Sequence, residues 1–267
     1  MGNAFFVVWR ESLEAFLIAG ILFAWLQAND DTGKGKRALF LGLGAGVGLA
    51  CLLGWALLGV QDELTGEALD MFQTATLFVA AGLITQMVLW MRKHGRTMKA
   101  RLHAELSSAA ERSGHLGVAV VAALAVAREG AETVIFLYGL AQGGEMSALA
   151  FGTVTGLAVA ALTAWITAKS LARLNIALLL RLSSILLLVL ASALLVAALD
   201  RLIGAGYLPP LLDPVWDTSL LLDDTTKGGK LIADFSGYRA RPSLSELLVW
   251  AGYWAVVLFA WRRTSRG

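Results

Sequence analysis

The chain has 267 residues, of which 57% are hydrophobic and only 16% are charged. Soluble domains carry roughly 25% charged residues, so the composition excludes an ordinary soluble globular protein and indicates a polytopic membrane protein. The formal net charge is only +2, and we expect no nucleic-acid partner. The chain has a single cysteine, Cys51, which excludes an intrachain disulfide and a metal site built from several thiolates.

We predict an all-α membrane protein with seven spans, because seven segments reach the roughly 20 residues that a helix needs to cross about 30 Å of hydrocarbon. The predicted spans cover residues 4–27, 38–61, 68–91, 116–140, 147–171, 177–203 and 244–262. No basic region precedes the first span, so we expect no cleavable signal peptide.

The Lys and Arg residues in the loops and at the span ends predict the orientation, because such residues accumulate on the cytoplasmic side. Four of them lie in the 204–243 segment, and fifteen lie on the opposite side. The fifteen are Lys34, Lys36, Arg37, Arg92, Lys93, Arg96, Lys99, Arg101, Arg112, Lys169, Arg173, Arg181, Arg262, Arg263 and Arg266. We therefore expect the N-terminus outside and the C-terminus inside.

The first six spans resemble a duplication. Between the second and fifth spans, small residues and a tryptophan recur at a constant offset, as Gly42/Gly152, Gly46/Gly156, Ala50/Ala160 and Trp55/Trp165. A repeated three-span unit must be inverted, which is a common transporter architecture. We predict a single permease domain with one repeat over about 4–91, another over about 116–203, and a last helix at 244–262.

Two connecting segments are long. The basic inner loop at 92–115 is predicted to be a helical extension that contacts water or lipid headgroups. The outer loop at 204–243 would gate the outer entrance or dock a partner, or else serve as an ordered connector, and the sequence leaves these alternatives open.

Two copies of one charged pentapeptide lie inside predicted spans, Arg10-Glu11-Ser12-Leu13-Glu14 in the first and Arg128-Glu129-Gly130-Ala131-Glu132 in the fourth. Each charge at a helix centre costs about 3 kcal/mol, so six charges facing lipid would cost roughly 15–20 kcal/mol. On a helix that turns about 100° per residue, the three charges of each copy share one face. They are therefore expected to face protein, water or a cation.

The four glutamates of the two copies are the predicted metal ligands, and the two arginines are their ion-pair partners. The glutamates are Glu11, Glu14, Glu129 and Glu132, and the arginines are Arg10 and Arg128. Carboxylate oxygens suit iron, manganese, magnesium or calcium, whereas copper(I) calls for Cys or Met, which this face lacks. All three histidines fall within 92–115, so a zinc or haem site with histidine ligands inside the membrane is not expected.

A structural interpretation of the pentapeptides remains open beside the cation pathway. In it, Arg10–Glu14 and Arg128–Glu132 only fix the packing of the helices, but Glu11 and Glu129 are then left without a role. In the cation pathway, the arginines keep the carboxylates ionised and repel small monovalent cations.

A further acidic pair, Glu67 and Asp70, begins the third span at its predicted outer end. The pair would form an outer-mouth acidic site that concentrates cations, or would only be the usual acidic first turn of a helix.

With these motifs the sequence resembles the iron permease family, which includes the fungal high-affinity iron permease and the bacterial EfeU-type permeases. The resemblance covers nearly the whole chain and looks closest to the bacterial branch. Besides the pentapeptides, it is carried by Glu67-Ala68-Leu69-Asp70, Trp90-Met91-Arg92-Lys93, Trp216-Asp217-Thr218-Ser219 and Gly237-Tyr238-Arg239-Ala240-Arg241-Pro242-Ser243.

The resemblance implies a seven-span iron importer of the bacterial inner membrane, not an enzyme, with no cofactor and with Fe²⁺ or Fe³⁺ as its transported substrate. It implies iron-binding roles for the four glutamates of the pentapeptides, and it maps an acidic pair of the family onto Glu67 and Asp70. Asp70 replaces the more usual Glu, and Met71-Phe72 replace a Glu-Gly of the family pattern.

Relatives usually work with an iron oxidase or a periplasmic iron-handling protein, so we expect such a partner besides membrane lipid. A carrier for another hard cation such as manganese, and a non-transporting membrane scaffold, are the alternatives.

Overall fold

The computed structural model describes residues 2–29, 33–94, 97–142, 145–169 and 176–264, and within these ranges it contains eight helices and no strand. The helices are α1 (Gly2–Asn29), α2 (Lys34–Glu63), α3 (Glu67–His94), α4 (Met98–Ala141), α5 (Met146–Ala168), α6 (Ile176–Gly204), α7 (Lys227–Ser236) and α8 (Leu244–Thr264). Arg96, Arg173 and Arg266, which contributed to the predicted orientation, lie outside the described residues.

Five helices, α2, α3, α5, α6 and α8, are long and apolar enough to cross a membrane, so the chain is a multi-pass membrane protein. The other two long helices, α1 and α4, coincide with predicted spans and contain the charged pentapeptides. All four prolines of the chain fall between residues 209 and 242, so none interrupts a long helix.

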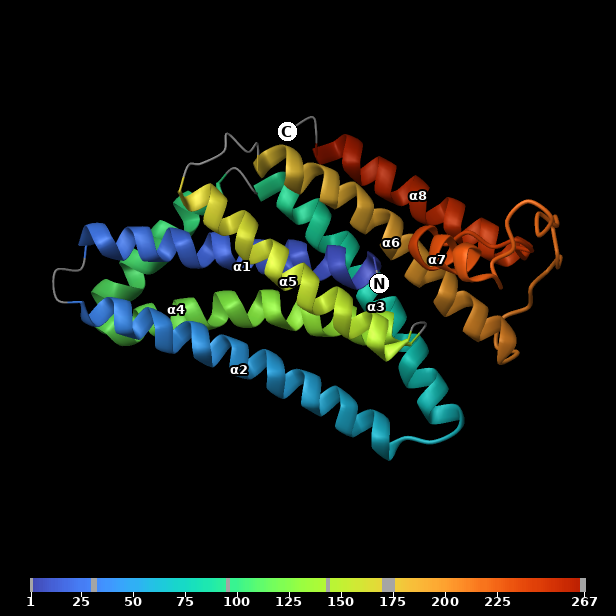
Figure 1. Ribbon diagram of the computed structural model, residues 1–267, viewed down its shortest axis with the longest axis horizontal. Coiled ribbons are helices and arrows are strands. Elements are labelled where there is room, and N and C mark those ends of the chain that lie inside the picture. The colour runs from blue at the N-terminus through green and yellow to red at the C-terminus, as the bar shows by residue number, and fades with distance from the viewer. Residues whose placement is uncertain (1, 30–32, 95–96, 143–144, 170–175, 265–267) are drawn as a thin grey trace.

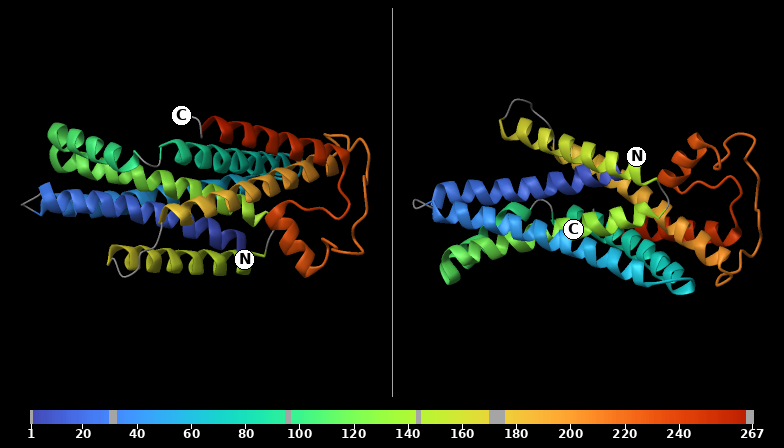
Figure 2. Two further views of the ribbon diagram at one scale, coloured as in Figure 1. Left: turned by 90° about the horizontal axis from the view of Figure 1, so that it is seen from above. Right: turned by 60° about the horizontal axis from the view of Figure 1, so that its bottom comes forward.

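The long helices alternate in direction, and their connections gather at two ends of the molecule (Figure 1). One end holds the start of α1, the connections from α2 to α3 and from α4 to α5, and the segment from α6 to α8. Figure 2 shows that this last segment, including α7, forms a cap over that end. As a result α1 and α4 run antiparallel beside each other.

Small residues set the closest helix contacts. In α2, Gly42, Gly46 and Ala50 are buried, and α2 packs most extensively against α4. A Cβ added at Gly46 would lie 2.7 Å from the carbonyl oxygen of Ala123 in α4, so only glycine permits this approach.

The equivalent positions of α5 make the corresponding contact with α1. Gly152, Gly156 and Ala160 are buried, and a Cβ at Gly156 would lie 2.6 Å from the carbonyl oxygen of Phe5. Trp55 and Trp165, the last pair of the sequence match, are both exposed on the outer faces of these helices.

The basic segment at 92–115 is mostly helical, because α4 begins at Met98 and bends at Gly114, which has a φ of 57°. In Figure 1 this first part of α4 runs crosswise to the rest of the helix. Leu102 and Leu106 bury their side chains in a cluster with Leu22 of α1 and Leu39 of α2. The segment therefore closes one end of the bundle and keeps charged side chains such as Arg101, Glu105 and Arg112 exposed.

The 204–243 segment is ordered by hydrogen bonds and ion pairs. Arg239 pairs with Asp200 at the end of α6 at 2.5 Å, and Arg241 pairs with Asp217 at 3.0 Å. Hydrogen bonds from Ser219 lower the pKa of Asp217 below its usual range. This structure agrees with an ordered connector.

Candidate functional site

The two charged pentapeptides lie next to each other inside the helix bundle, where α1 and α4 run antiparallel. Arg10, Glu11, Glu14 and Glu129 are all buried, and the side chain of Arg10 is only 1% exposed. The burial of four ionisable groups in one place is costly unless they are paired with each other or with an ion.

In the first copy, Arg10 lies between its two glutamates. Its Nη1 atom lies 2.9 Å from Glu11 Oε1, and its Nη2 atom lies 2.8 Å from Glu14 Oε1. The helical spacing of the motif explains the contact with Glu14, because residues i and i+4 are neighbours on a helix surface. One guanidinium group therefore partly neutralises two buried carboxylates.

The second copy has the same sequence spacing but a more open geometry. Arg128 Nε lies 3.2 Å from Glu132 Oε1 and 4.0 Å from Glu129 Oε1, and the side chain of Arg128 is 48% exposed. Its guanidinium group lies over the ring of Trp90 in α3, 4.6 Å from the ring centroid. The two arginines thus differ strongly in burial, although their motifs match.

Carboxylate oxygens from both helices converge. One oxygen each from Glu11, Glu14 and Glu129 lies within 4.8 Å of the other two. In addition, Glu11 Oε2, Glu129 Oε2 and Glu132 Oε2 are buried without a hydrogen-bond partner among the described residues. Like charges this close repel each other strongly in a buried site, and a bound cation would remove that repulsion.

Gly130 allows the second pentapeptide to approach α2. A Cβ at this position would lie 2.6 Å from the Cβ of Ala50, one of the buried small residues of α2. The glycine inside the motif therefore sets the depth of α4 in the bundle, and with it the positions of Glu129 and Glu132.

Met87 of α3 is a neighbour of the site that the sequence analysis missed. It is buried, and its Sδ atom lies 2.5 Å from Arg10 Nη1. The sequence pattern could not indicate this residue, because the six methionines are scattered along the chain and no spacing links Met87 to the pentapeptides.

The predicted outer acidic pair lies apart from the carboxylate cluster. Glu67 and Asp70 are exposed in the first turn of α3. The hydroxyl of Tyr207, from the segment after α6, donates a hydrogen bond to the Glu67 carboxylate. The structure therefore places the pair at the end of the molecule that also holds the start of α1.

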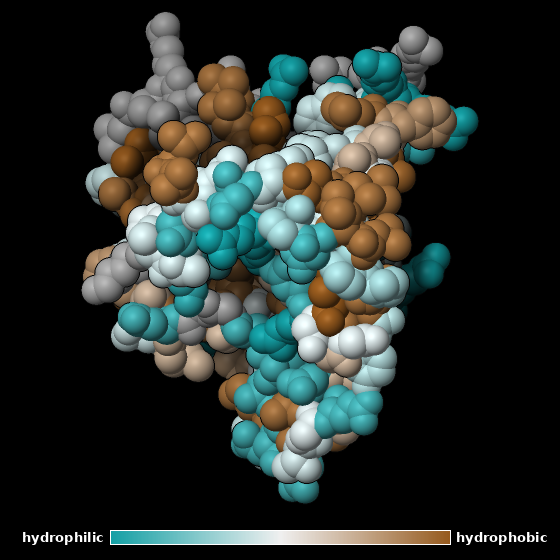
Figure 3. All heavy atoms as spheres, turned by 90° about the vertical axis from the view of Figure 1, so that its right-hand side faces the viewer, coloured by the Kyte–Doolittle hydropathy of each residue, from teal (hydrophilic) through white to brown (hydrophobic). Residues whose placement is uncertain are grey.

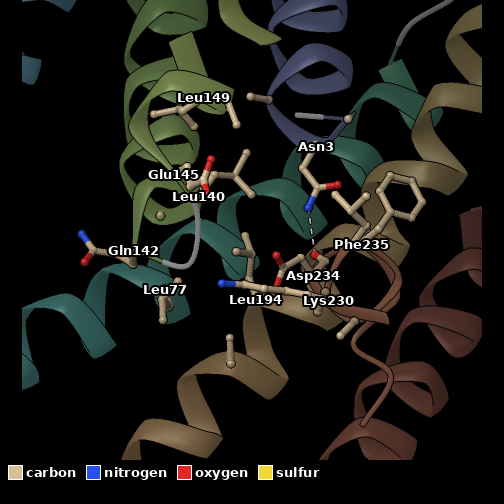
Figure 4. A pocket seen from close by; sticks show the side chains of 18 of the residues that line it. Asn3, Leu77, Leu140, Gln142, Glu145, Leu149, Leu194, Lys230, Asp234 and Phe235 are labelled. Atoms are coloured by element: carbon tan, nitrogen blue, oxygen red, sulfur yellow. Dashed lines mark hydrogen bonds between the residues drawn. The ribbon is translucent and has the colours of Figure 1, made fainter. Parts of the chain in front are cut away.

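A cavity of about 720 Å³ opens at the same end, between the start of α1, the end of α4, α6 and α7. Its charged lining residues are Glu145, Arg201, Lys230, Asp234 and Arg239. Figure 4 shows Asn3 facing α7, where its amide donates to the backbone carbonyl of Asp234 at 2.8 Å.

The end that contains this cavity carries both hydrophilic and hydrophobic side chains at its surface. A band of hydrophilic side chains crosses this face in Figure 3. Partial burial raises the pKa of Asp234 at the cavity wall, because desolvation disfavours its charged form.

The cavity and the carboxylate cluster lie along the same two helices. Ala4 and Gly139 line the cavity, and each is seven residues from a glutamate of the pentapeptides, Glu11 and Glu132 respectively. Seven helical residues span about 10 Å. Between the two levels along α1 and α4, Val7 and Phe136 belong to one buried apolar cluster, together with Leu77, which also lines the cavity. Apolar side chains therefore lie between the cavity and the carboxylates.

Comparison with known proteins gives consistent results across the chain. A sequence model of the Iron permease FTR1 family matches residues 1–262. The Ferrous iron permease EfeU of Shigella sonnei (strain Ss046) is 29% identical over 260 residues, which cover 96% of this chain and 94% of that protein. The protein of the same name from Escherichia coli O157:H7 gives the same values.

A third relative, the Ferrous iron permease EfeU of Escherichia coli O6:H1 (strain CFT073), is 29% identical over 258 residues, covering 96% of this chain and 93% of that protein. No solved structure matches the chain. A permease moves a solute across a membrane, so the chain is a transporter and not an enzyme, and it belongs to the Iron permease FTR1 family.

Proposed function

We propose that this chain imports iron across a bacterial inner membrane through a central site formed by Glu11, Glu14, Glu129 and Glu132. The observation that carries the proposal is the convergence of carboxylate oxygens of Glu11, Glu14 and Glu129, which come from two different helices, lie within 4.8 Å of one another and are buried in the bundle. Glu132 is not one of this group of three, and it enters the proposed site as the i+3 neighbour of Glu129 on α4. The family and the printed names of the relatives support iron as the cargo.

The proposed architecture has seven spans in an N-out, C-in orientation, with α1 to α3 and α4 to α6 as inverted repeats of one permease domain. The packing supports it, because α2 packs chiefly on α4 just as α5 packs chiefly on α1. If α1 is exchanged with α4 and α2 with α5, the α2–α4 contact becomes the α5–α1 contact. This is expected for two repeats related by a twofold axis.

The proposed route starts at the 720 Å³ cavity, which would be the outer vestibule, and leads about 10 Å further to the carboxylates. Glu145 and Asp234 would attract the cation there, with Glu67 and Asp70 as a more distant acidic mouth. In this conformation the apolar cluster around Val7 and Phe136 closes the outer side.

The two arginines lie on opposite sides of the proposed site. Each arginine precedes its two glutamates in the sequence, and α1 and α4 are antiparallel. Arg10 therefore lies on the outer side of its glutamates, and Arg128 lies on the inner side of its own. The exposure of Arg128 and the burial of Arg10 suit a site that is shut outward and more open inward. Relative motion of the repeats would reverse this difference and release the cargo.

The proposal is tested by uptake of radioactive iron into liposomes that contain the purified protein, with Fe²⁺ under reductant and chelated Fe³⁺ in parallel. We expect Glu14→Gln and Glu132→Gln each to abolish uptake, because an amide keeps the side-chain shape but removes the charge that offsets desolvation of the cation. Glu111→Gln is the matched control, since Glu111 is exposed on α4 and lies outside the pentapeptides.

Wild-type uptake by both glutamine variants, in protein that inserts normally, would refute the central site. If instead the wild-type protein carries manganese in preference to iron, the carboxylate site stands and the cargo changes, because oxygen ligands alone suit either ion. Iron uptake that appears only after an iron-oxidising or iron-binding protein is added would support a periplasmic partner.

A further inference from the structure

Met87 places a thioether sulfur against the charged groups of the proposed iron site. The residue lies in the middle of α3 and is only 4% exposed. Its Sδ atom and Glu11 Oε1 contact the same nitrogen, Arg10 Nη1, at 2.5 and 2.9 Å. The sulfur and the carboxylate therefore face one small region, which the Arg10 guanidinium group occupies in this conformation.

A cation that binds Glu11 would compete with Arg10 for this region. The guanidinium group carries a positive charge, so an arriving cation repels it from the carboxylate while the neutral sulfur is not repelled. Once the guanidinium group moves away, a cation in contact with Glu11 has the Met87 sulfur beside it as a further ligand.

The position of Met87 is distinct from that of the next methionine on the same helix. Met91 lies one turn later, is partly buried, and packs against the apolar cluster of α3 and α6. Met87 also belongs to that cluster, but its sulfur is turned to Arg10. Packing alone would be served equally well by leucine, which has a similar volume.

We propose that the Met87 thioether is a soft ligand for the transported cation, and that it biases the site toward ferrous iron. Thioether sulfur is polarisable and prefers softer ions than carboxylate oxygen does. The thioether would add little to the affinity for Mg²⁺ or Ca²⁺. It would add more to the affinity for Fe²⁺ than to the affinity for Mn²⁺ or Fe³⁺. The inference rests on the proposed function, because it assigns a ligand to the same central site.

The test compares wild type, Met87→Leu and the control Met91→Leu in the same liposome assay, with Fe²⁺ and Mn²⁺ supplied together. We expect Met87→Leu to lower the ratio of Fe²⁺ to Mn²⁺ uptake several-fold, because leucine fills the volume but cannot bind the cation. Met91→Leu is expected to keep the wild-type ratio.

X-ray absorption at the iron edge gives a second readout that does not depend on transport. Wild type and Met91→Leu loaded with Fe²⁺ should show a sulfur neighbour of the iron, and Met87→Leu should show only oxygen or nitrogen neighbours. An unchanged uptake ratio in Met87→Leu, or iron with no sulfur neighbour in wild type, would overturn the inference.

Failure of this inference is distinguishable from failure of the proposed function. If wild-type iron uptake depends on Glu14 but Met87→Leu behaves like Met91→Leu, the carboxylate site stands without a sulfur ligand. If wild-type iron uptake, with or without an added iron-oxidising or iron-binding protein, is independent of Glu14, the central site is wrong and the assignment of Met87 as its sulfur ligand is wrong too.

Discussion

The two arginines of the pentapeptides show how position in the bundle gives identical motifs different energetics. Arg10 is enclosed with two carboxylates, whereas Arg128 has one close carboxylate, an aromatic face and an open side. Removing one partner of a buried ion pair costs about 3–5 kcal/mol, because it leaves an unpaired buried charge, while exposed pairs contribute about 1 kcal/mol or less.

Arg10→Gln should therefore destabilise the protein far more than Arg128→Gln. We expect a large fall in the melting temperature of the detergent-purified protein for Arg10→Gln and a small one for Arg128→Gln, measured by monodispersity after heating. Equal melting temperatures for the two variants would show that the difference in burial has no energetic consequence.

At the scale of helices, the repeated small residues decide how closely the pentapeptide helices can be held. Gly46 of α2 contacts the backbone of α4, and Gly156 of α5 contacts the backbone of α1. Without these glycines both charged helices would move away from their neighbours, and the carboxylates would no longer converge. The glycines therefore act on the site through helix position and not through chemistry.

Gly46→Ala should destabilise the protein and weaken transport, whereas Gly44→Ala should not. The added methyl at Gly46 meets Ala123 at 2.7 Å, and overpacking of this kind costs about 1–3 kcal/mol. Gly44 has open space around it, and alanine favours a helix over glycine by up to about 1 kcal/mol.

Melting temperature and iron uptake of the two glycine variants give the comparison. A fall in both quantities for Gly46→Ala alone is expected. Similar behaviour of the two variants would mean that α2 and α4 can separate without loss of the site.

At the scale of the whole molecule, the distribution of charge predicts how the bundle lies in the membrane. The basic first part of α4 closes one end, and the polar segment from α6 to α8 caps the other. The first carries exposed basic residues such as Arg101 and Arg112, as expected for a cytoplasmic surface.

Single cysteines introduced at these two ends should react from opposite sides of the membrane. With Cys51 replaced by serine, we expect Asp213→Cys to be labelled by an impermeant maleimide from outside intact spheroplasts, and Arg112→Cys only after the membrane is permeabilised. The reverse pattern would contradict the proposed orientation.

Much of the fold could be predicted from the sequence. In lipid, backbone polar groups must be hydrogen-bonded within the protein, so an apolar segment of sufficient length indicates a membrane-spanning helix. The predicted limits 68–91 and 177–203 differ by only a few residues from those of α3 and α6. The helical character of the basic segment was also predicted, but its fold-back at Gly114 was not, since the left-handed φ of a single glycine leaves no pattern in the sequence.

By itself the sequence determined the composition of the site, since two pentapeptides with i, i+3 and i, i+4 spacing place their charges on one face of each helix. Only the tertiary structure decided that Glu11, Glu14 and Glu129 converge, that Met87 contacts Arg10, and that Arg10 and Arg128 differ in burial. The physical reason is that helical periodicity fixes directions within one helix, whereas distances between helices depend on side-chain packing between segments far apart in the chain.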